Sequence, residues 1–173
     1  MDMADLTLND EFSMIESIQS VLQPSSCRVK IGIGDDAALI ASNHSNLLVS
    51  TDLFIEQVHF RQDWSKPSEF VRKAWIANLS DINAMGGQPV AIVLGLGLPR
   101  ESSLEFREEV IKAIGEVSDE FGVELVGGDI VASPQITLAI TVLGEPGERV
   151  LTRSAAEPGQ SLFLSGSIGA SRA

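Results

Sequence analysis

The spacing of apolar residues along the chain changes repeatedly between the period of a helix and that of a strand. Apolar positions three and four residues apart predict helices over about 10–22, 67–85 and 104–121. Pro67 suits the first position of its helix, Ser102 or Ser103 can cap the next helix, and Gly122 fits the position that ends it. Short apolar runs between turn residues predict strands at 29–33, 37–41, 47–51, 90–98, 123–126, 136–143 and 161–165.

Strands and long helices are interspersed along the whole chain, which indicates an α/β or α+β fold. The segment 53–65 has no clean period and is interpreted as a strand end followed by a loop. The sequence contains neither an internal repeat nor a linker rich in proline and serine. We therefore expect one domain.

Composition narrows the range of functions. The 173 residues include 24 acidic and 12 basic side chains, for a net charge of −12. Such a chain repels a phosphate backbone, so nucleic-acid binding is disfavoured, and an anionic substrate would need a counter-charge. A single cysteine, Cys27, excludes an internal disulfide framework and a cysteine-cluster zinc site, and it fits the reducing cytoplasm. Residues 1–10 lack the apolar region of a signal peptide, and no apolar run approaches the ~20 residues of a membrane span.

Aspartates stand at the ends of several predicted elements. Asp36 and Asp129 follow strands through glycine-containing turns, and Asp52 ends another strand. Turn formation or helix capping alone explains each of them. Ser50 and Thr51 add hydroxyl oxygens beside Asp52, which either ligate a magnesium ion or simply favour a strand.

Asp81 is harder to explain by local structure. A helix with 100° per residue places it on one stripe with Phe70, Ala74, Asn78 and Met85. An ionised carboxylate on such a stripe is costly unless it is paired, and no basic residue shares the stripe. A bound cation is therefore its expected partner. Several aspartates without a nearby cysteine or histidine form a hard-oxygen set, which suits Mg²⁺.

Three further positions allow two interpretations each. Gly128, in the pair Gly127-Gly128, permits close approach of a phosphate, although the spacing is not that of a Walker loop or a dinucleotide fingerprint. His59 is either a half-buried spacer or a ligand. Arg153 is either a surface base or a phosphate-binding fork.

Five segments carry these residues in a specific order and spacing. They are 32–38 (GIGDDAA), 49–52 (VSTD) followed by His59-Phe60, 78–86 (NLSDINAMG), 125–129 (LVGGD) and 151–154 (LTRS). Together they resemble the thiamine-monophosphate kinase family, which belongs to the aminoimidazole ribonucleotide synthetase-like superfamily. The resemblance runs from about Glu11 to Gly169.

The resemblance implies an ATP-dependent transfer of the γ-phosphoryl group onto thiamine monophosphate, giving thiamine diphosphate, with several Mg²⁺ ions. It implies an α/β domain with a mixed sheet, helices on one side, and a homodimer formed through that sheet. His59 would contact the thiamine phosphate, and Gly128 and Arg153 would contact ATP. The implied magnesium ligands are Asp36, Ser50, Thr51, Asp52, Asp81 and Asp129.

The chain departs from the family pattern at three positions and in length. Gln57 stands where glycine is usual, Ile130 where threonine is usual and Ala170 where aspartate is usual. Family members carry a further C-terminal domain. We therefore expect residues 1–173 to be the N-terminal ATP- and Mg²⁺-binding and dimerisation domain, catalytically incomplete by itself.

Two alternatives remain open at this point. One is another ATP-using enzyme of the superfamily, similar to aminoimidazole ribonucleotide synthetase or to selenophosphate synthetase. For the latter, Cys27 is a poor match to the expected reactive cysteine in a glycine-rich segment. The other is a non-catalytic dimerisation or nucleotide-binding module.

Overall fold

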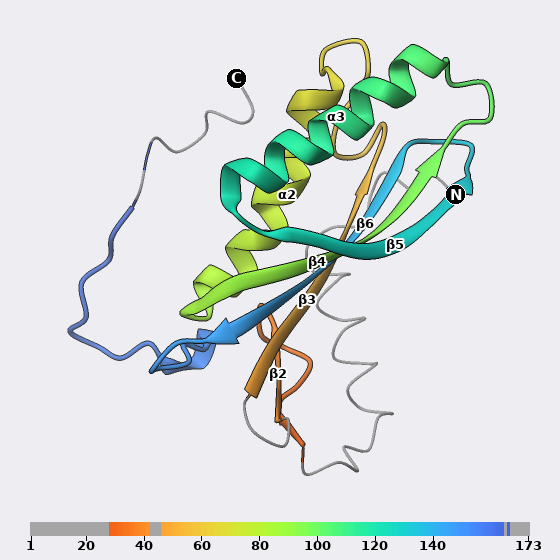
Figure 1. Ribbon diagram of the computed structural model, residues 1–173. Coiled ribbons are helices and arrows are strands. Elements are labelled where there is room, and N and C mark those ends of the chain that lie inside the picture. The colour runs from red at the N-terminus through yellow and green to blue at the C-terminus, as the bar shows by residue number, and fades with distance from the viewer. Residues whose placement is uncertain (1–27, 42–45, 165, 167–173) are drawn as a thin grey trace, which may run out of the picture.

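Two helices cover one face of a six-stranded sheet in the computed structural model, which describes residues 28–41, 46–164 and 166 (Figure 1). The helices are α2 (Pro67–Ala84) and α3 (Leu104–Phe121). The strands are β1 (Val29–Ile31), β2 (Ala38–Ala41), β3 (Asn46–Ile55), β4 (Gly87–Leu98), β5 (Glu124–Ala132) and β6 (Thr137–Pro146). Their order is β1-β2-β3-β6-β4-β5, and every pairing is antiparallel except β4–β5. The predicted mixed sheet with helices on one side is confirmed, and the helix expected near 10–22 lies outside the described residues.

The core lies between the sheet and the helices and follows from the period of each element. Along β6 every second residue faces the helices, and Leu138, Ile140 and Val142 are completely buried. α2 contributes a matching apolar stripe that includes Phe70 and Trp75. Full burial of a large apolar side chain contributes roughly 1.5–3 kcal/mol, so this layer holds α2 firmly on the sheet.

The C-terminal end of α2 lies very close to the sheet. Ile82 packs against Gly144 of β6, where an added Cβ would stand only 2.5 Å from the Ile82 Cγ2 atom. Glycine at position 144 therefore permits the close approach. Because Asp81 precedes Ile82, the same approach brings the Asp81 carboxylate to the sheet.

The predicted ends of α3 are confirmed. The Ser103 side chain accepts the backbone N–H of Phe106 at 3.1 Å, and Gly122 ends the helix with a φ of 62°. Neither α2 nor α3, the helices of the described residues, is long and apolar enough to cross a membrane.

Four strands, β3, β4, β5 and β6, extend beyond their predicted limits, and β3 and β5 do so through candidate site residues. β3 continues through Asp52, because Leu48–Ile55 pairs without interruption with β6. β5 contains Gly127-Gly128 and Asp129, which were expected to follow the strand. A register shift between Ile92 and Val93 accommodates the glycines in the parallel pairing with β4. Hydrogen bonding to the neighbouring strand therefore extends β3 and β5 through residues whose sequence favours a turn.

The strand predicted at 161–165 is wrong over its described part. Residues 161–164 form no strand, and Leu162 and Phe163 are almost wholly exposed. No strand of the described sheet pairs with this segment, so its apolar run has no partner to fold against.

A tight turn follows β3. The backbone N–H of Gln57 donates to the Phe60 carbonyl at 2.8 Å, and that of His59 donates to the Ile55 carbonyl at 2.9 Å. Gln57 closes the turn with a φ of 68°, in the left-handed region where a side chain is strained. The glycine that is usual at this position in the resembled family would adopt this conformation without that strain.

Replacing Gln57 by glycine should stabilise the protein. The left-handed conformation costs a side-chain-bearing residue about 1–2 kcal/mol, and glycine's greater freedom in the unfolded chain offsets part of the gain. We expect a net gain of about 1 kcal/mol in urea unfolding. Gln88→Gly is the matched control, because Gln88 lies in β4 without a positive φ, and glycine there should destabilise. Equal effects of the two substitutions would contradict the assigned strain.

Candidate metal and nucleotide site

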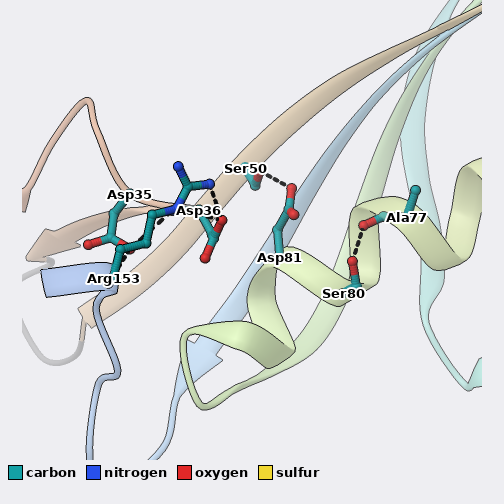
Figure 2. A network of polar contacts seen from close by, with 7 residues as sticks. All are labelled: Asp35, Asp36, Ser50, Ala77, Ser80, Asp81 and Arg153. Atoms are coloured by element: carbon teal, nitrogen blue, oxygen red, sulfur yellow. Dashed lines mark hydrogen bonds and ion pairs between the residues drawn. The ribbon is translucent and has the colours of Figure 1, made fainter. Parts of the chain in front are cut away.

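Carboxylates gather where the end of α2 meets β3. Asp81 points from α2 toward β3, and the Ser50 hydroxyl donates a 2.8 Å hydrogen bond to its Oδ2 atom (Figure 2). Asp52 lies two residues further along β3 on the same side of the sheet. This follows because Ser50 and Asp52 stand opposite Val142 and Ile140, which are buried beneath the helices.

The ionised form of the Asp81 carboxylate is disfavoured where it lies. Burial raises its pKa above the ordinary value by disfavouring the charged form, and the negative charges of Asp52 and Asp36 raise it further. The hydrogen bond from Ser50 and the charge of Arg153 act in the opposite direction. A cation at this place would stabilise the ionised carboxylate that its neighbours disfavour.

Arg153 brings a positive charge to the same place. It lies in the short 3₁₀ helix η1 (Arg153–Ala155), and its Nε atom donates to Asp36 Oδ1 at 3.0 Å, with an ion pair from Nη2 (Figure 2). Its backbone N–H donates to Asp35 Oδ1 at 3.2 Å. The hydrogen bonds to Asp36, and then the charges of Asp36, Asp35 and Asp81, raise the Arg153 pKa against the effect of burial.

The structure therefore brings five expected site residues into one neighbourhood, which we call the acidic group: Asp36, Ser50, Asp52, Asp81 and Arg153. Arg153 forms an ion pair with it through Asp36. With Asp35 adjacent, the carboxylates outnumber this cation, so the acidic group keeps an excess of negative charge.

Thr51, an expected magnesium ligand, faces the other side of the sheet. Its hydroxyl donates to the Ile140 carbonyl at 3.0 Å and lies 3.0 Å from the Thr141 hydroxyl. Successive side chains of a strand point to opposite faces, so Ser50 and Thr51 do not face the same space.

Asp129 and Gly128 lie two intervening strands away from Asp52. Asp52 stands in line with Ile140, Leu94 and Gly128 on successive strands, and three spacings of about 4.8 Å put β5 roughly 14 Å from β3. Asp129 is the next residue and so faces the opposite side from this row. Glycine at position 128 serves packing here, because an added Cβ would collide with the Leu94 carbonyl oxygen.

The acidic group fits Mg²⁺ by the chemistry of its donors, although it does not form a complete protein cage. Among residues 28–41, 46–164 and 166, no three His, Cys, Asp or Glu side chains form a group that could hold a metal ion by themselves. Mg²⁺ usually keeps several waters and takes one or two carboxylates together with substrate phosphates. Asp36, Asp52 and Asp81 supply hard oxygens of the kind this coordination requires.

His59 lies beyond the end of β3, at the outer end of a stack of aromatic rings. Its imidazole stacks on Phe54 with centroids 4.8 Å apart, Phe54 on Phe60 at 6.0 Å, and Phe60 on Phe70 at 4.3 Å. The three phenylalanines are buried and His59 is exposed, so the stack anchors the imidazole to the core. The backbone N–H of Ile55 donates to Nδ1 at 3.0 Å, which leaves Nε2 as the protonated nitrogen of the neutral ring.

Sequence reasoning missed Lys73 and the role of Asp35. The Lys73 ammonium donates to the His59 carbonyl at 2.9 Å and lies 5.5 Å from the centre of the Phe54 ring. Asp35 is not among the expected site residues, yet its carboxylate accepts the Arg153 backbone N–H. No local pattern marks either contact, because each joins separate elements.

Comparison with known proteins agrees with this fold. Residues 34–145 match the family described as AIR synthase related protein, N-terminal domain, and the chain belongs to that family. It is 39% identical over 144 residues to the thiamine-monophosphate kinase of Corynebacterium glutamicum, covering 81% of this chain and 44% of that protein. It is 36% identical over 165 residues to the thiamine-monophosphate kinase of Mycobacterium tuberculosis, covering 94% and 49%.

The similarity extends to solved structures. AaThiL complexed with AMPPCP and TMP matches with a TM-score of 0.73 and 28% identity, over 91% of this chain and 47% of that chain. The chain thus spans about half the length of the curated relatives it matches.

Asp81→Asn should stabilise the protein at neutral pH but not in acid. The folded-state pKa of Asp81 lies above the ordinary value of 3.8, so well below pH 3.8 both states are protonated and Asp81 carries no penalty. As the pH rises through 3.8 and then through the folded pKa, the unfolded state loses its proton first and stability falls. Urea unfolding at pH 7 and pH 3 without Mg²⁺ measures the difference. Asp119→Asn, at an exposed position of α3, controls for the lost charge. Lower stability of Asp81→Asn at pH 7 would contradict the assignment.

Proposed function

We propose that this chain is the ATP- and Mg²⁺-binding N-terminal domain of a kinase that converts thiamine monophosphate to thiamine diphosphate. The observation that carries the proposal is the acidic group, in which hard oxygens surround one arginine. The names of the curated relatives, thiamine-monophosphate kinase, support this activity. The complex of AaThiL with AMPPCP, an ATP analogue, and TMP supports the two substrates.

The reaction depends on positioning and charge neutralisation more than on proton transfer. The acceptor is a phosphate oxygen that is already ionised near neutral pH, so no side chain has to act as a general base. Bound Mg²⁺ would supply neutralisation of the phosphate charge. Asp36, Asp52 and Asp81, with Ser50, would hold it, and Arg153 would bind phosphates of ATP.

The remaining site residues are proposed on the resemblance alone. Thr51 and Asp129 are predicted magnesium ligands, Gly128 a predicted contact of ATP, and His59 a predicted contact of the thiamine phosphate.

We also propose a homodimer formed through the sheet face that the helices leave uncovered. Leu53 of β3 and Val93 of β4 alternate with the helix-facing residues of their strands and are 57% and 37% exposed. A second copy of the sheet would bury these side chains.

We further propose a cytoplasmic location. The single cysteine, Cys27, supports it, because a chain without disulfides fits a reducing compartment.

Asp81→Asn and Asp129→Asn should each lower turnover at least about a hundredfold in the kinase that carries this domain, because each removes a charge that holds phosphate-bound metal. Production of thiamine diphosphate from ATP and thiamine monophosphate is the measurement, with Asp119→Asn as control. Full activity of both variants at limiting Mg²⁺ would refute the metal-ligand assignment. Turnover of an aminoimidazole precursor instead of thiamine monophosphate would favour the other enzymes of the superfamily.

Arg153 and Mg²⁺ should compete for Asp36 when no nucleotide is present. Arg153→Gln removes the positive charge that neutralises this carboxylate, so we expect several-fold tighter binding of Mg²⁺ alone. The same substitution should weaken binding of ATP with Mg²⁺ about tenfold, because a charge-assisted contact to phosphate is lost. Calorimetric titration of the 173-residue chain measures both. Arg149→Gln, at an exposed arginine outside the acidic group, is the control. Weaker binding of both ligands to Arg153→Gln would contradict competition.

A further inference from the structure

A cavity of about 470 Å³ lies between the first two turns of α3 and the carboxyl ends of β4 and β5. These elements form a β-α-β unit, because β4 and β5 are parallel neighbours and α3 connects them (Figure 1). Sheets with parallel strands commonly bind their ligands outside the carboxyl ends of those strands. The volume of the cavity is in the range of small-molecule sites. Its place and its size thus both suit a small ligand.

One part of the cavity lining is apolar and open to water. Leu96 and Leu98 of β4 lie on its sheet side, where Leu96 is only 4% exposed. Ile111 of α3 and Ile130 of β5, in contrast, are 66% and 73% exposed. β5 is the last strand in the sheet order, so no described strand continues the sheet beyond Ile130. An apolar group in the cavity would remove Ile111 and Ile130 from water, which is favourable.

The other part of the lining is basic. Arg100 and Arg107 both line the cavity, and among residues 28–41, 46–164 and 166 neither forms an ion pair. The Arg107 Nη2 atom donates to the Arg100 carbonyl at 2.8 Å, which holds this guanidinium at the end of β4. The Arg107 Nε atom is buried and has no hydrogen-bond partner in the described part of the chain. No acidic side chain of the described residues lines the cavity, so its charge is positive in a chain of net charge −12.

We propose that this cavity, which we call the arginine cavity, binds a small carboxylate with an apolar body. The forks of Arg100 and Arg107 match the two oxygens of a carboxylate, and the apolar lining takes the body. A carboxylate on Arg107 also offsets the cost of burying part of that cation without a partner. A singly charged head group suits an acidic chain better than a phosphate, which the chain repels more strongly. Neither the acidic group nor Gly128 lines the arginine cavity, so this ligand is distinct from the substrates of the proposed function.

Titration of octanoate, below the concentration at which it forms micelles, into the 173-residue chain tests the arginine cavity. The backbone amide NMR signals of the lining residues report binding. We expect saturable shifts there, with an apparent Kd that rises about tenfold in Arg107→Met or Arg100→Met. Arg107→Lys keeps the charge but loses the fork, so its Kd should fall between those of the wild type and Arg107→Met. Arg149→Met, at an exposed arginine outside the cavity, should leave the Kd unchanged.

A series of probes separates the apolar and the basic parts of the arginine cavity. From butanoate through hexanoate to octanoate, each additional CH₂ group should lower the Kd by up to about fourfold, because it is buried against the apolar lining. Octanol, which lacks the charge, should bind at least about tenfold more weakly than octanoate. Ile130→Ser shortens the apolar lining at an exposed position and should weaken the dependence on chain length. Arg107→Met should keep that dependence while it weakens every carboxylate.

Four outcomes would overturn the arginine cavity as a carboxylate site. They are the absence of saturable shifts, a Kd in Arg107→Met equal to that of the wild type, an affinity that does not depend on chain length, and binding of octylamine as tight as that of octanoate. Shifts of the same signals with protein concentration alone would overturn it too, because a second copy would then cover the cavity. Asp81→Asn, which alters the acidic group, should leave the Kd of octanoate unchanged, so failure of the proposed kinase reaction leaves the arginine cavity standing.

Discussion

The packing of α2 against the sheet is the constraint on which the rest of this structure depends. The stripe that contacts β3 and β6 contains Phe70, Trp75 and Ile82, all essentially buried, and Asp81 lies beside it. Each such apolar side chain contributes roughly 1.5–3 kcal/mol when buried, and together they outweigh the penalty of one partly buried carboxylate. Asp81 is therefore held beside Ser50 and close to other carboxylates, because moving it into water would withdraw the helix from its core.

The concentration of negative charge in the acidic group determines which ions can bind there. The acidic group disfavours its own ionised state, so it gains from any cation, whether the guanidinium of Arg153 or a magnesium ion carrying phosphates. At the turn beyond β3, the Lys73 ammonium donates to the His59 carbonyl, and among the described residues neither side chain forms an ion pair with a carboxylate.

Much of the fold, and part of the site, could be predicted from local patterns. The helical period alone marked Asp81 as a carboxylate on an apolar stripe, and Ser103 and Gly122 marked the ends of α3. The predicted ends of β3 and β5 were wrong, because pairing with β6 and β4 continued through Asp52 and through the glycines before Asp129. Successive side chains of a strand point to opposite faces of the sheet, so Ser50 and Thr51 cannot both face the same site. The sequence-based grouping of these two neighbouring hydroxyls did not take this alternation into account.

The sequence by itself determined which helices and strands have an apolar face, where glycines permit close contacts, and how strongly acidic the chain is. These properties are local or additive, so they can be read position by position. Only the tertiary structure decided that Arg153 pairs with Asp36 and that Lys73 supports His59. These partners are 117 and 14 residues apart, and their meeting depends on how whole strands and helices pack. Electrostatic energy depends on distance in space, which the order of residues along a chain does not specify.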